Sequence, residues 1–396
     1  MSDRPLNILY VLNRLSVGGM EKRVAALAIR LRREGWRTGM LCLTEGGEME
    51  PALREAGVEI FILGYRGLRA AGPLGLLRAV RGGRRAVRAF GADAVQAFLP
   101  MGNILGALMT GGRRSEARGR RGSGQPCLIA GKVTSGFYYR RGRLYGVLEN
   151  WALRRAALVV VNAGAIAEEI IRVNGVPRDR LRVIHNGVQV SPPPAPGERA
   201  ARRAHWRARL GLAPESFLIG TVANLYAYKG HRFLIEAARG AAVRFPDVHL
   251  VFAGRDEGEA EALRRRAAAL GLDGRVHLPG PVADVRDFLL ALDALVSPSL
   301  VEGFSNVWLE AMAAALPCVF TRVGGAGEAF RDGEECLLVP PGDSAALAAA
   351  LERLLTDAAL RERLGAQAWA AVRERFSFDR MVEDYKRMYR ETLGEG

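Results

Sequence analysis

The chain has 396 residues, enough for two domains of ordinary size, and its 49% apolar and 25% charged content is typical of a folded globular protein. No apolar run approaches the roughly 18 residues that a membrane span needs, which excludes a membrane-spanning protein of the helical class. Because the N-terminal sequence Met1-Ser-Asp-Arg-Pro5 also lacks the pattern of a signal peptide, we expect a cytoplasmic protein.

The net charge of +15 is unevenly distributed along the chain. Residues 1–190 carry 31 Lys and Arg against 14 Asp and Glu, a net charge of +17, whereas the remainder carries 26 against 28, a net charge of −2. A drift in composition toward arginine explains the choice of 53 Arg over 4 Lys, but it does not explain why the excess lies in one half. We therefore expect the first half to face an anionic partner, such as the inner face of a membrane, which the protein would contact peripherally.

The first predicted elements, in chain order, are a buried strand, a glycine-containing loop and a helix. The strand covers Leu6 to Leu12, the loop ends in Gly18-Gly19, and a helix with periodic apolar residues starts at Met20. This order is typical of the start of a Rossmann-type domain, although the G-x-G-x-x-G dinucleotide fingerprint is absent.

Strands and helices then alternate, which predicts a parallel sheet with helices on both faces. The predicted strands are 38–43, 58–63, 94–98, 127–131, 158–161 and 181–184, and the predicted helices are 51–56, 74–90, 102–109, 143–156 and 165–174. The four cysteines are scattered in apolar surroundings without metal-ligand spacing, so we expect reduced core thiols: Cys42, Cys127, Cys318 and Cys336.

Two segments of the first half do not fit this alternation. Gly111 to Gln125 is rich in Gly, Arg and Ser and predicts a basic loop. Gly136 to Arg143 mixes aromatic residues with arginine, which suits a membrane interface, a clamp on an anionic acceptor or an ordinary exposed loop. Beyond Phe137 to Tyr139 the basic half has no aromatic-rich recognition motif, so a nucleic-acid partner is not expected.

The first domain is predicted to end near residue 190. His185-Asn-Gly-Val-Gln189 precedes a stiff proline-rich linker, Ser191 to Gly197. The second domain, 191–377, opens with the strand Phe217 to Val222, the loop Asn224 to Gly230 and a helix from about His231. A strand at 249–253, a helix at 258–270 and a strand with a turn at 276–282 follow, and a final helix covers 378–393.

The stretch from Ser297 to Phe330 has the features of an anion-binding site. A short apolar strand (294–296) leads into the turn Glu302-Gly-Phe-Ser305, and Asn306 stands in front of an Ala/Leu/Met-rich helix that Pro317 stops. Free backbone N–H groups at such a helix N-terminus bind phosphate.

Two carboxylates bracket this predicted site. Glu302 lies on the turn, and Glu310 lies four residues past Asn306, about one helical turn along the same face. Carboxylates accept hydrogen bonds from sugar hydroxyls, while N–H groups hold a diphosphate, so the pattern suits a sugar nucleotide. The alternative, a turn residue and a solvated helix residue, remains open on spacing alone.

The sequence Glu302-Gly-Phe-Ser-Asn-Val-Trp-Leu-Glu310-Ala-Met resembles the signature of the family 4 retaining, nucleotide-sugar-dependent glycosyltransferases. The resemblance implies an α/β protein with the GT-B fold: two facing Rossmann-like domains with parallel sheets, and a C-terminal helix (378–396) that crosses back to the first domain. It also implies that residues 1–190 bind the acceptor and residues 191–377 the sugar nucleotide.

The resemblance assigns roles to particular residues. It places Glu310 on the ribose hydroxyls and Glu302 on the donor sugar, with the backbone of the motif residues Gly303, Phe304, Ser305 and Asn306 in the same site. The other donor contacts that it implies are Gly18 and Gly19, Asn224 and Lys229 at the diphosphate, and Gly280 and Val282 at the base. Two residues depart from the family pattern, which has an arginine in place of Asn224 and an acid in place of Gln189.

By resemblance we expect a hexose or N-acetylhexosamine to pass, with retention, from a UDP-sugar in preference to a GDP-sugar to a lipid-linked or cell-surface polysaccharide acceptor. Lys229 would take the charge of the leaving group and Glu302 would orient the sugar. The chain has no Asp-x-Asp pattern, so neither a metal ion nor another cofactor is expected.

All five histidines lie at or beyond the predicted boundary of the first domain: His185, His205, His231, His249 and His277. This is compatible with internal return, where the leaving phosphate itself takes the acceptor proton. Lys132, Gln96 and Asn103, which lie at or just after predicted strand ends, are then the candidate polar groups near the sugar. A catalytically silent GT-B protein that binds lipid or a partner is the alternative, and a sugar-nucleotide epimerase is a weaker one.

Overall fold

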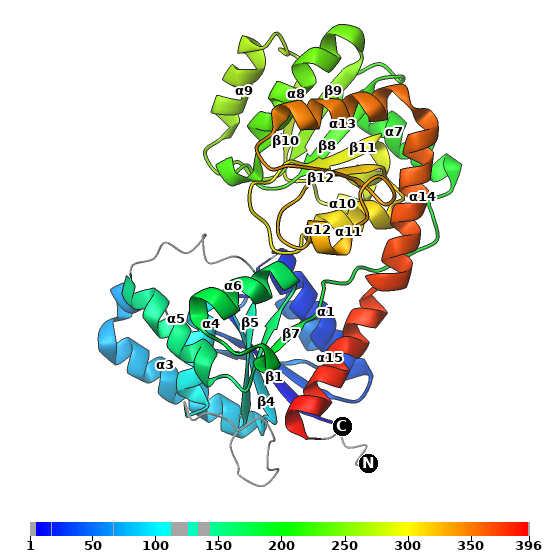
Figure 1. Ribbon diagram of the computed structural model, residues 1–396. Helices are drawn as coiled ribbons and strands as arrows, with labels where there is room; N and C mark the ends of the chain where they lie inside the picture. The colour runs from blue at the N-terminus through cyan, green and yellow to red at the C-terminus, as the bar shows by residue number, and fades with distance from the viewer. Residues whose placement is uncertain (1–4, 17, 66, 112–125, 134–142, 395–396) are drawn as a thin grey trace. The chain divides into compact units, whose positions relative to one another are not determined.

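The computed structural model describes residues 5–16, 18–65, 67–111, 126–133 and 143–394. The chain divides into two compact units, which are described separately: unit 1 contains Met1–His185 and Met381–Gly396, and unit 2 contains Asn186–Arg380 (Figure 1). Apart from their end residues Gly111 and Arg143, the two irregular segments of the first half lie outside the described residues.

Unit 1 is built on a seven-stranded parallel sheet in the order β3-β2-β1-β4-β5-β6-β7. Its apolar runs form the predicted strands within one or two residues: β1 (Asn7–Leu12), β2 (Arg37–Cys42), β3 (Glu59–Ile62), β4 (Ala94–Phe98), β5 (Cys127–Lys132), β6 (Leu158–Val161) and β7 (Leu181–Val183). The helices between them are α1 (Gly19–Arg33), α2 (Glu50–Glu55), α3 (Leu68–Phe90), α4 (Leu99–Met109), α5 (Arg143–Arg155) and α6 (Gly164–Asn174), with a short turn of helix η2 (Arg178–Arg180).

Unit 2 repeats this plan with a six-stranded parallel sheet in the order β10-β9-β8-β11-β12-β13. The strands are β8 (Phe217–Val222), β9 (Val248–Ala253), β10 (Val276–Gly280), β11 (Ala294–Ser297), β12 (Cys318–Thr321) and β13 (Leu337–Val339). The helices are α7 (Pro196–Leu210), η3 (Ala227–Lys229), α8 (His231–Arg244), α9 (Ala260–Ala269), α10 (Val285–Ala291), α11 (Asn306–Ala313), α12 (Ala326–Ala329), α13 (Ser344–Thr356) and α14 (Ala358–Arg375).

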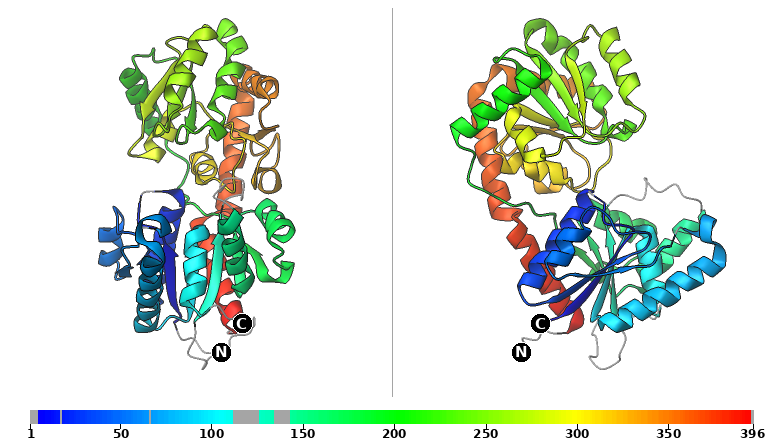
Figure 2. Two further views of the ribbon diagram at one scale, coloured as in Figure 1. Left: turned by 90° about the vertical axis from the view of Figure 1, so that its left-hand side faces the viewer. Right: turned by 180° about the vertical axis from the view of Figure 1, so that it is seen from behind.

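Helices cover both faces of each sheet, as Figure 2 shows from two further directions. In unit 2, α8 packs against α9 and α13 on one face, and α10 packs against α7 and α11 on the other. The strands therefore read as continuous apolar runs, because both of their faces are buried. In each sheet the strand order reverses once, between β1 and β4 and between β8 and β11, and such reversals place ligand sites at the carboxyl ends of strands.

The final helix α15 (Phe378–Leu393) has the predicted bounds, and its residues from Met381 onward belong to unit 1. The hydroxyl of Tyr389 is hydrogen-bonded to the hydroxyl of Tyr10 at 3.2 Å and donates to Oε1 of Gln96. Gln96 lies in the middle of β4 and is fully buried, so the interpretation of Gln96 as a strand-end group near the sugar is wrong. Its carboxamide instead helps to fix the last helix to the sheet.

The linker prediction is also corrected in part. The Pro-rich segment does not extend unstructured to Gly197, because α7 begins at Pro196. A proline suits the first turn of a helix, since its missing N–H would have no partner there. The arginine-rich sequence that follows contains Arg207, which is fully buried and bonded to the carboxylate of Asp293 at 2.6 Å.

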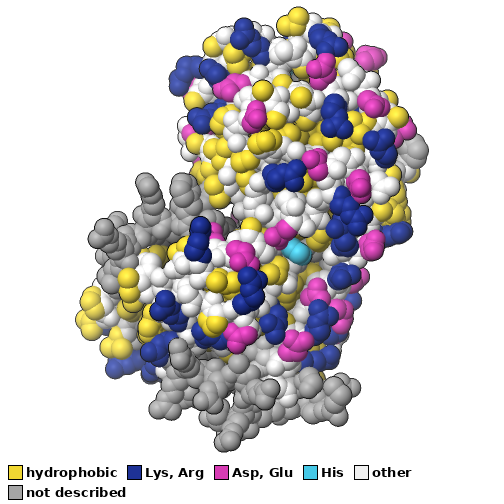
Figure 3. Space-filling model, in the orientation of Figure 1, with side chains coloured by type: hydrophobic (Ala, Val, Ile, Leu, Met, Phe, Trp, Pro, Cys, Tyr) yellow, Lys and Arg dark blue, Asp and Glu magenta, His cyan; other side chains and the backbone are white. Residues whose placement is uncertain are grey.

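All four cysteines are buried and free, as expected. Within the described part of the chain, no helix is both long and apolar enough to cross a membrane. On the face visible in Figure 3, Lys and Arg side chains are spread over both units.

Candidate functional site

The carboxyl ends of β8 and β11 lie side by side where the strand order of unit 2 reverses, and their loops are tied together. The N–H of Leu300 donates to the carbonyl of Tyr228 at 2.8 Å. Gly230 has a φ of 72°, and a Cβ atom there would lie 2.0 Å from the carbonyl oxygen of Pro298. Only glycine fits this close approach, so the glycine next to Lys229 fixes the β8 loop against the β11 loop.

The side chains of Lys229 and Glu302 form an ion pair in this place. Nζ of Lys229 lies 2.6 Å from Oε1 of Glu302, and the Ser299 hydroxyl donates to the same oxygen at 2.8 Å. The two side chains are only 18% and 13% exposed. Oε2 of Glu302 has no hydrogen-bond partner among the described residues, so one carboxylate oxygen is held and the other is available.

The turn Glu302 to Ser305 is held in place by the loop after β12. The N–H of Gly325 donates to the carbonyl of Gly303 at 2.7 Å. Gly324 has a φ of 52°, and a Cβ atom there would lie 2.2 Å from the carbonyl oxygen of Gly303. Phe304 is buried against Trp308, Phe330 and Phe376, so its side chain anchors the turn.

The helix α11 starts one residue earlier than the capping pattern predicts. Asn306 is its first helical residue, and Ser305 holds the N-cap position without a capping bond from its side chain. Asn186, which sequence reasoning did not single out, donates to the carbonyl of Phe304 and to Oδ1 of Asn306, both at 2.7 Å. The Asn306 side chain is thereby held by Asn186 at the start of α11.

Glu310 lies one helical turn beyond Asn306 on α11 and is half-buried. The opposite face of α11 carries the buried residues Trp308, Leu309, Ala311 and Met312. Asn306 and Glu310 thus lie one turn apart on α11, directly after the turn that carries Glu302.

The ends of β8, β9 and β10 are joined in a row beside this pair. Oδ1 of Asn224 accepts from the N–H of Arg255 at 3.1 Å, and the N–H of Gly254 donates to the carbonyl of Gly280 at 3.0 Å. Gly280 has a φ of 80°, and Val282 follows it half-buried. The rings of Tyr226 and Tyr228 stack with centroids 5.2 Å apart on the β8 loop.

His231, directly after this loop, is not suited to proton transfer at neutral pH. Its side chain is buried against Phe252, and burial together with the charge of Lys229 lowers its pKa to about 4. The imidazole is therefore neutral at pH 7.

In unit 1 the candidate residues lie after β1, at the end of β5 and in α4, the helix that follows β4. Gly18 is the N-cap residue of α1 and Gly19 its first residue. Lys132 ends β5 and is only 7% exposed, and its Nζ lies 3.4 Å from Oε1 of Glu149 on α5. Asn103 is fully buried and donates to the carbonyl of Gly131 at 3.2 Å.

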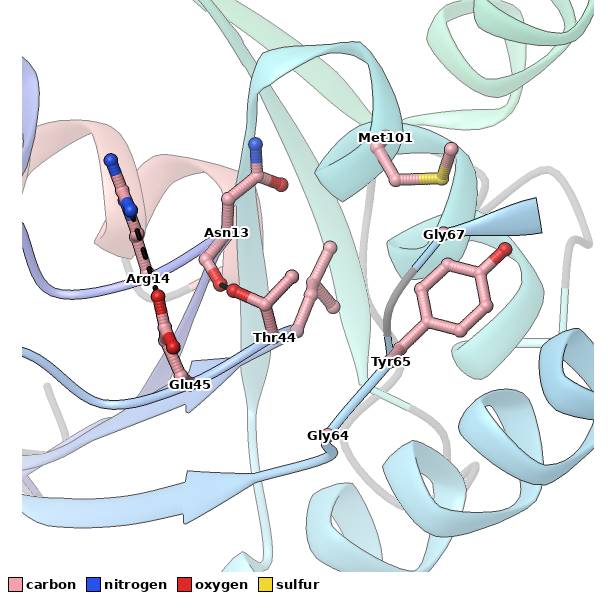
Figure 4. A pocket seen from close by; sticks show the side chains of 9 residues that line it. Asn13, Arg14, Thr44, Glu45, Gly64, Tyr65, Gly67 and Met101 are labelled. Carbon is pink, nitrogen blue, oxygen red and sulfur yellow. Dashed lines mark hydrogen bonds and ion pairs between the residues drawn. The ribbon is translucent and has the colours of Figure 1, made fainter. Parts of the chain in front are cut away.

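A pocket of about 630 Å³ lies at the same edge of unit 1 (Figure 4). It is lined by the loops after β1, β2 and β3 and by the first turn of α4: Asn13, Arg14, Leu43, Thr44, Glu45, Gly64, Tyr65, Gly67 and Met101. Arg14 and Glu45 are paired at 3.6 Å. The pocket thus combines an apolar wall of Tyr65, Met101 and Leu43 with polar groups, which suits a ring with hydroxyl groups.

Among the described residues, no group of three or more His, Cys, Asp or Glu side chains is placed to hold a metal ion.

Comparison with known proteins agrees with this geometry. Residues 18–187 match the model of the glycosyl transferase 4-like domain, and residues 216–357 match the model of the glycosyl transferases group 1. The boundary between the two matches falls in the segment that separates unit 1 from the first strand of unit 2. The two units are thus those of a glycosyltransferase.

Curated relatives extend this result. The putative glycosyltransferase EpsD of Bacillus subtilis is 30% identical over 316 residues, which cover 77% of this chain and 78% of EpsD. The D-inositol 3-phosphate glycosyltransferase of Acidothermus cellulolyticus is 35% identical over 249 residues, which cover 60% of this chain. The match spans only about half the length, 54%, of that relative.

Among solved structures, Anabaena HepE in complex with UDP and glucose superposes with a TM-score of 0.81 at 23% identity, covering 97% of this chain and 99% of HepE. The chain therefore belongs to the family 4 glycosyltransferases, and its fold is GT-B. The resemblance read from Glu302 to Met312 is confirmed.

Proposed function

We propose that this protein is a retaining glycosyltransferase that moves a hexose or N-acetylhexosamine from a UDP-sugar to a lipid-linked or cell-surface polysaccharide acceptor. The observation that carries the proposal is the meeting of Lys229, Glu302 and the uncapped start of α11 at one edge of the second sheet. A cation and a helix N-terminus suit a leaving diphosphate, and the second carboxylate oxygen of Glu302 suits a sugar hydroxyl.

The choice of UDP rests on comparison alone. Anabaena HepE was solved with UDP and with UDP-glucose, and its fold matches this chain over 97% of the length. At 22% to 23% identity this similarity establishes the shared fold, and the preference for uridine as the base is part of the proposal.

Transfer in this proposal is metal-independent and uses internal return. Lys229 stabilises the departing diphosphate, whose oxygen takes the proton of the acceptor hydroxyl as that hydroxyl attacks the sugar on the same face. Glu302 orients the sugar through Oε2.

Retention is tested by NMR assignment of the anomer formed from a UDP-α-sugar, and an inverted product would contradict it. Unchanged turnover in EDTA is expected.

Glu310→Ala is expected to weaken UDP binding about 10- to 100-fold, because two hydrogen bonds from ribose hydroxyls to a carboxylate are lost. Calorimetric titration with UDP, GDP and ADP checks the base and the variant together. Glu352→Ala, an exposed glutamate on α13, is the matched control and should bind as the wild type does.

The assignment of Glu310 to the ribose is tested separately with 2′,3′-dideoxy-UDP. The dideoxy ligand should bind the wild type as weakly as UDP binds Glu310→Ala, and the two losses should not add. Additive losses would place Glu310 elsewhere. A folded wild type that binds none of the three nucleotides would favour the alternative, a catalytically silent GT-B protein.

Unit 1 is proposed to bind the acceptor at the cytoplasmic face of an anionic membrane. Its pocket supports an acceptor with a hydroxyl-bearing ring. Helix α3 supports the membrane contact, because Leu74 is 70% and Leu77 is 44% exposed beside a row of exposed arginines: Arg78, Arg81, Arg84, Arg85 and Arg88. Apolar side chains flanked by arginine are typical of helices at an anionic interface.

The double variant Leu74→Glu/Leu77→Glu is expected to lose at least about tenfold in affinity for vesicles with anionic lipid, since it removes apolar contact and adds repulsion. Cosedimentation with phosphatidylglycerol vesicles measures this, and Val243→Glu, at an 84% exposed site in unit 2, is the control. Equal binding by the wild type and the double variant would rule out α3 as the contact.

A further inference from the structure

The candidate donor site has too little positive charge for its proposed ligand. A nucleoside diphosphate carries about three negative charges at neutral pH. Lys229 is already neutralised by Glu302 at 2.6 Å, and Glu310 adds a further carboxylate to the same edge of the sheet. A second cation is therefore needed to hold the diphosphate.

The loops that follow the six strands of unit 2, all within the described residues, contain three cationic side chains: Lys229, Arg255 and Arg322. Arg322 lies after β12, beyond β11 in the strand order, and is paired with Asp332 at 3.1 Å. Arg255 lies after β9. Its side chain is 67% exposed, and the carboxylate oxygen paired with its Nε, on Glu257, is 3.8 Å away. Arg255 is thus the least neutralised of the three.

The strand order places Arg255 between the two ends of a bound nucleotide. In the order β10-β9-β8-β11, the end of β9 separates the turn at Gly280 from the loop with Lys229. The hydrogen bonds follow the same order, because Gly254 is bonded to Gly280 on one side and Arg255 to Asn224 on the other. A nucleotide that extends from Gly280 to Lys229 must cross the β9 loop.

The backbone of Arg255 is fixed on the β8 loop at two points. Its N–H donates to Oδ1 of Asn224 at 3.1 Å, and its carbonyl accepts from the N–H of Leu225 at 2.8 Å. A Cβ atom on the preceding Gly254 would lie 2.0 Å from the carbonyl oxygen of Ala223, so glycine permits the two loops to meet. The Arg255 side chain therefore starts from a position held directly beside the loop that carries Lys229.

The backbone of the β9 loop is already engaged. The carboxylate of Asp256 accepts from the N–H groups of Gly258, Glu259 and Ala260 at 2.9 to 3.1 Å, which caps α9. The N–H of Arg255 itself is taken by Asn224. The guanidinium of Arg255 is therefore the positive group of the β9 loop that can bind an incoming anion.

We propose that Arg255 binds the diphosphate of the donor and supplies, with Lys229, the charge that the nucleotide needs. The inference rests on the donor site proposed above and adds a binding residue to it. The guanidinium makes two parallel hydrogen bonds to phosphate oxygens, which an ammonium cannot reproduce. The carboxamide of Asn224 acts through Arg255 and is a positioning group.

Arg255→Ala in the full chain is expected to weaken UDP binding about 10- to 100-fold in calorimetric titration, and Arg255→Lys to recover part of the loss. Uridine, measured by ligand NMR, lacks phosphate and should bind the wild type and Arg255→Ala equally. Arg264→Ala removes an exposed arginine from the neighbouring α9 and should leave UDP affinity unchanged.

The outcomes separate this inference from the proposed function. If the wild type binds UDP and Arg255→Ala binds it equally well, the assignment of Arg255 is overturned while the donor site stands. An equal loss of uridine affinity would place the guanidinium on the base and also overturn the assignment to the diphosphate. If the folded wild type binds no nucleoside diphosphate, the proposed function fails and the inference fails with it.

Discussion

Lys229→Ala is expected to lower the turnover of the UDP-sugar at least about 100-fold, because the leaving diphosphate loses the cation that faces it as its charge develops. Since this charge grows in the transition state, kcat should fall more than the affinity for the nucleotide does. Release of UDP from a UDP-sugar, with and without acceptor, measures both. Lys229→Arg should retain part of the rate.

Two checks make this result specific. Lys386→Ala removes a lysine of α15 in unit 1 that is paired with Glu383 on the same helix and with Glu34 at the end of α1. This variant should leave turnover unchanged. Glu302 keeps its hydrogen bond from Ser299 in the Lys229→Ala variant, so the turn should stay folded. A loss of less than about fivefold would show that Lys229 does not face the leaving group.

Glu149→Ala is expected to destabilise the protein by about 3–5 kcal/mol, because it leaves Lys132 buried without its carboxylate. Both side chains of this pair are less than one tenth exposed. The free energy of unfolding from urea titration measures the effect. A neutral pair, Lys132→Met with Glu149→Leu, should be close to the wild type in stability, since it removes both charges together.

The matched control is a pair of the same kind on the surface. Arg178 and Glu168 lie 2.6 Å apart and are 73% and 60% exposed. Glu168→Ala should therefore change stability by less than about 1 kcal/mol. The neutral pair also tests whether Lys132 contacts the donor sugar. If the stable Lys132→Met/Glu149→Leu protein has the turnover of the wild type, Lys132 is not part of the site.

The fold could be predicted because burial on both faces makes each strand a continuous apolar run, as at Phe217 to Val222. The motif from Glu302 to Glu310 could also be predicted, because its members lie within one turn and one helix. Local spacing is enough for both.

Contacts between distant residues could not be predicted in this way. The partner of Lys229 is Glu302, 73 residues later, and Asn186 holds Asn306 from 120 residues away. The burial of Gln96 depends on Tyr389 from the last helix, and the sequence around β4 alone does not show this contact. The place of Arg255 likewise follows from the strand order.

Hydrogen–deuterium exchange with and without UDP tests the location of the donor site most directly. With UDP bound, we expect slower exchange in the loops of unit 2 after β8, β9, β10 and β11, at residues 223–230, 254–259, 281–284 and 298–306. The start of α11 should show it most clearly, because its N–H groups would bind phosphate. UDP binding that leaves these four loops unprotected would contradict the account.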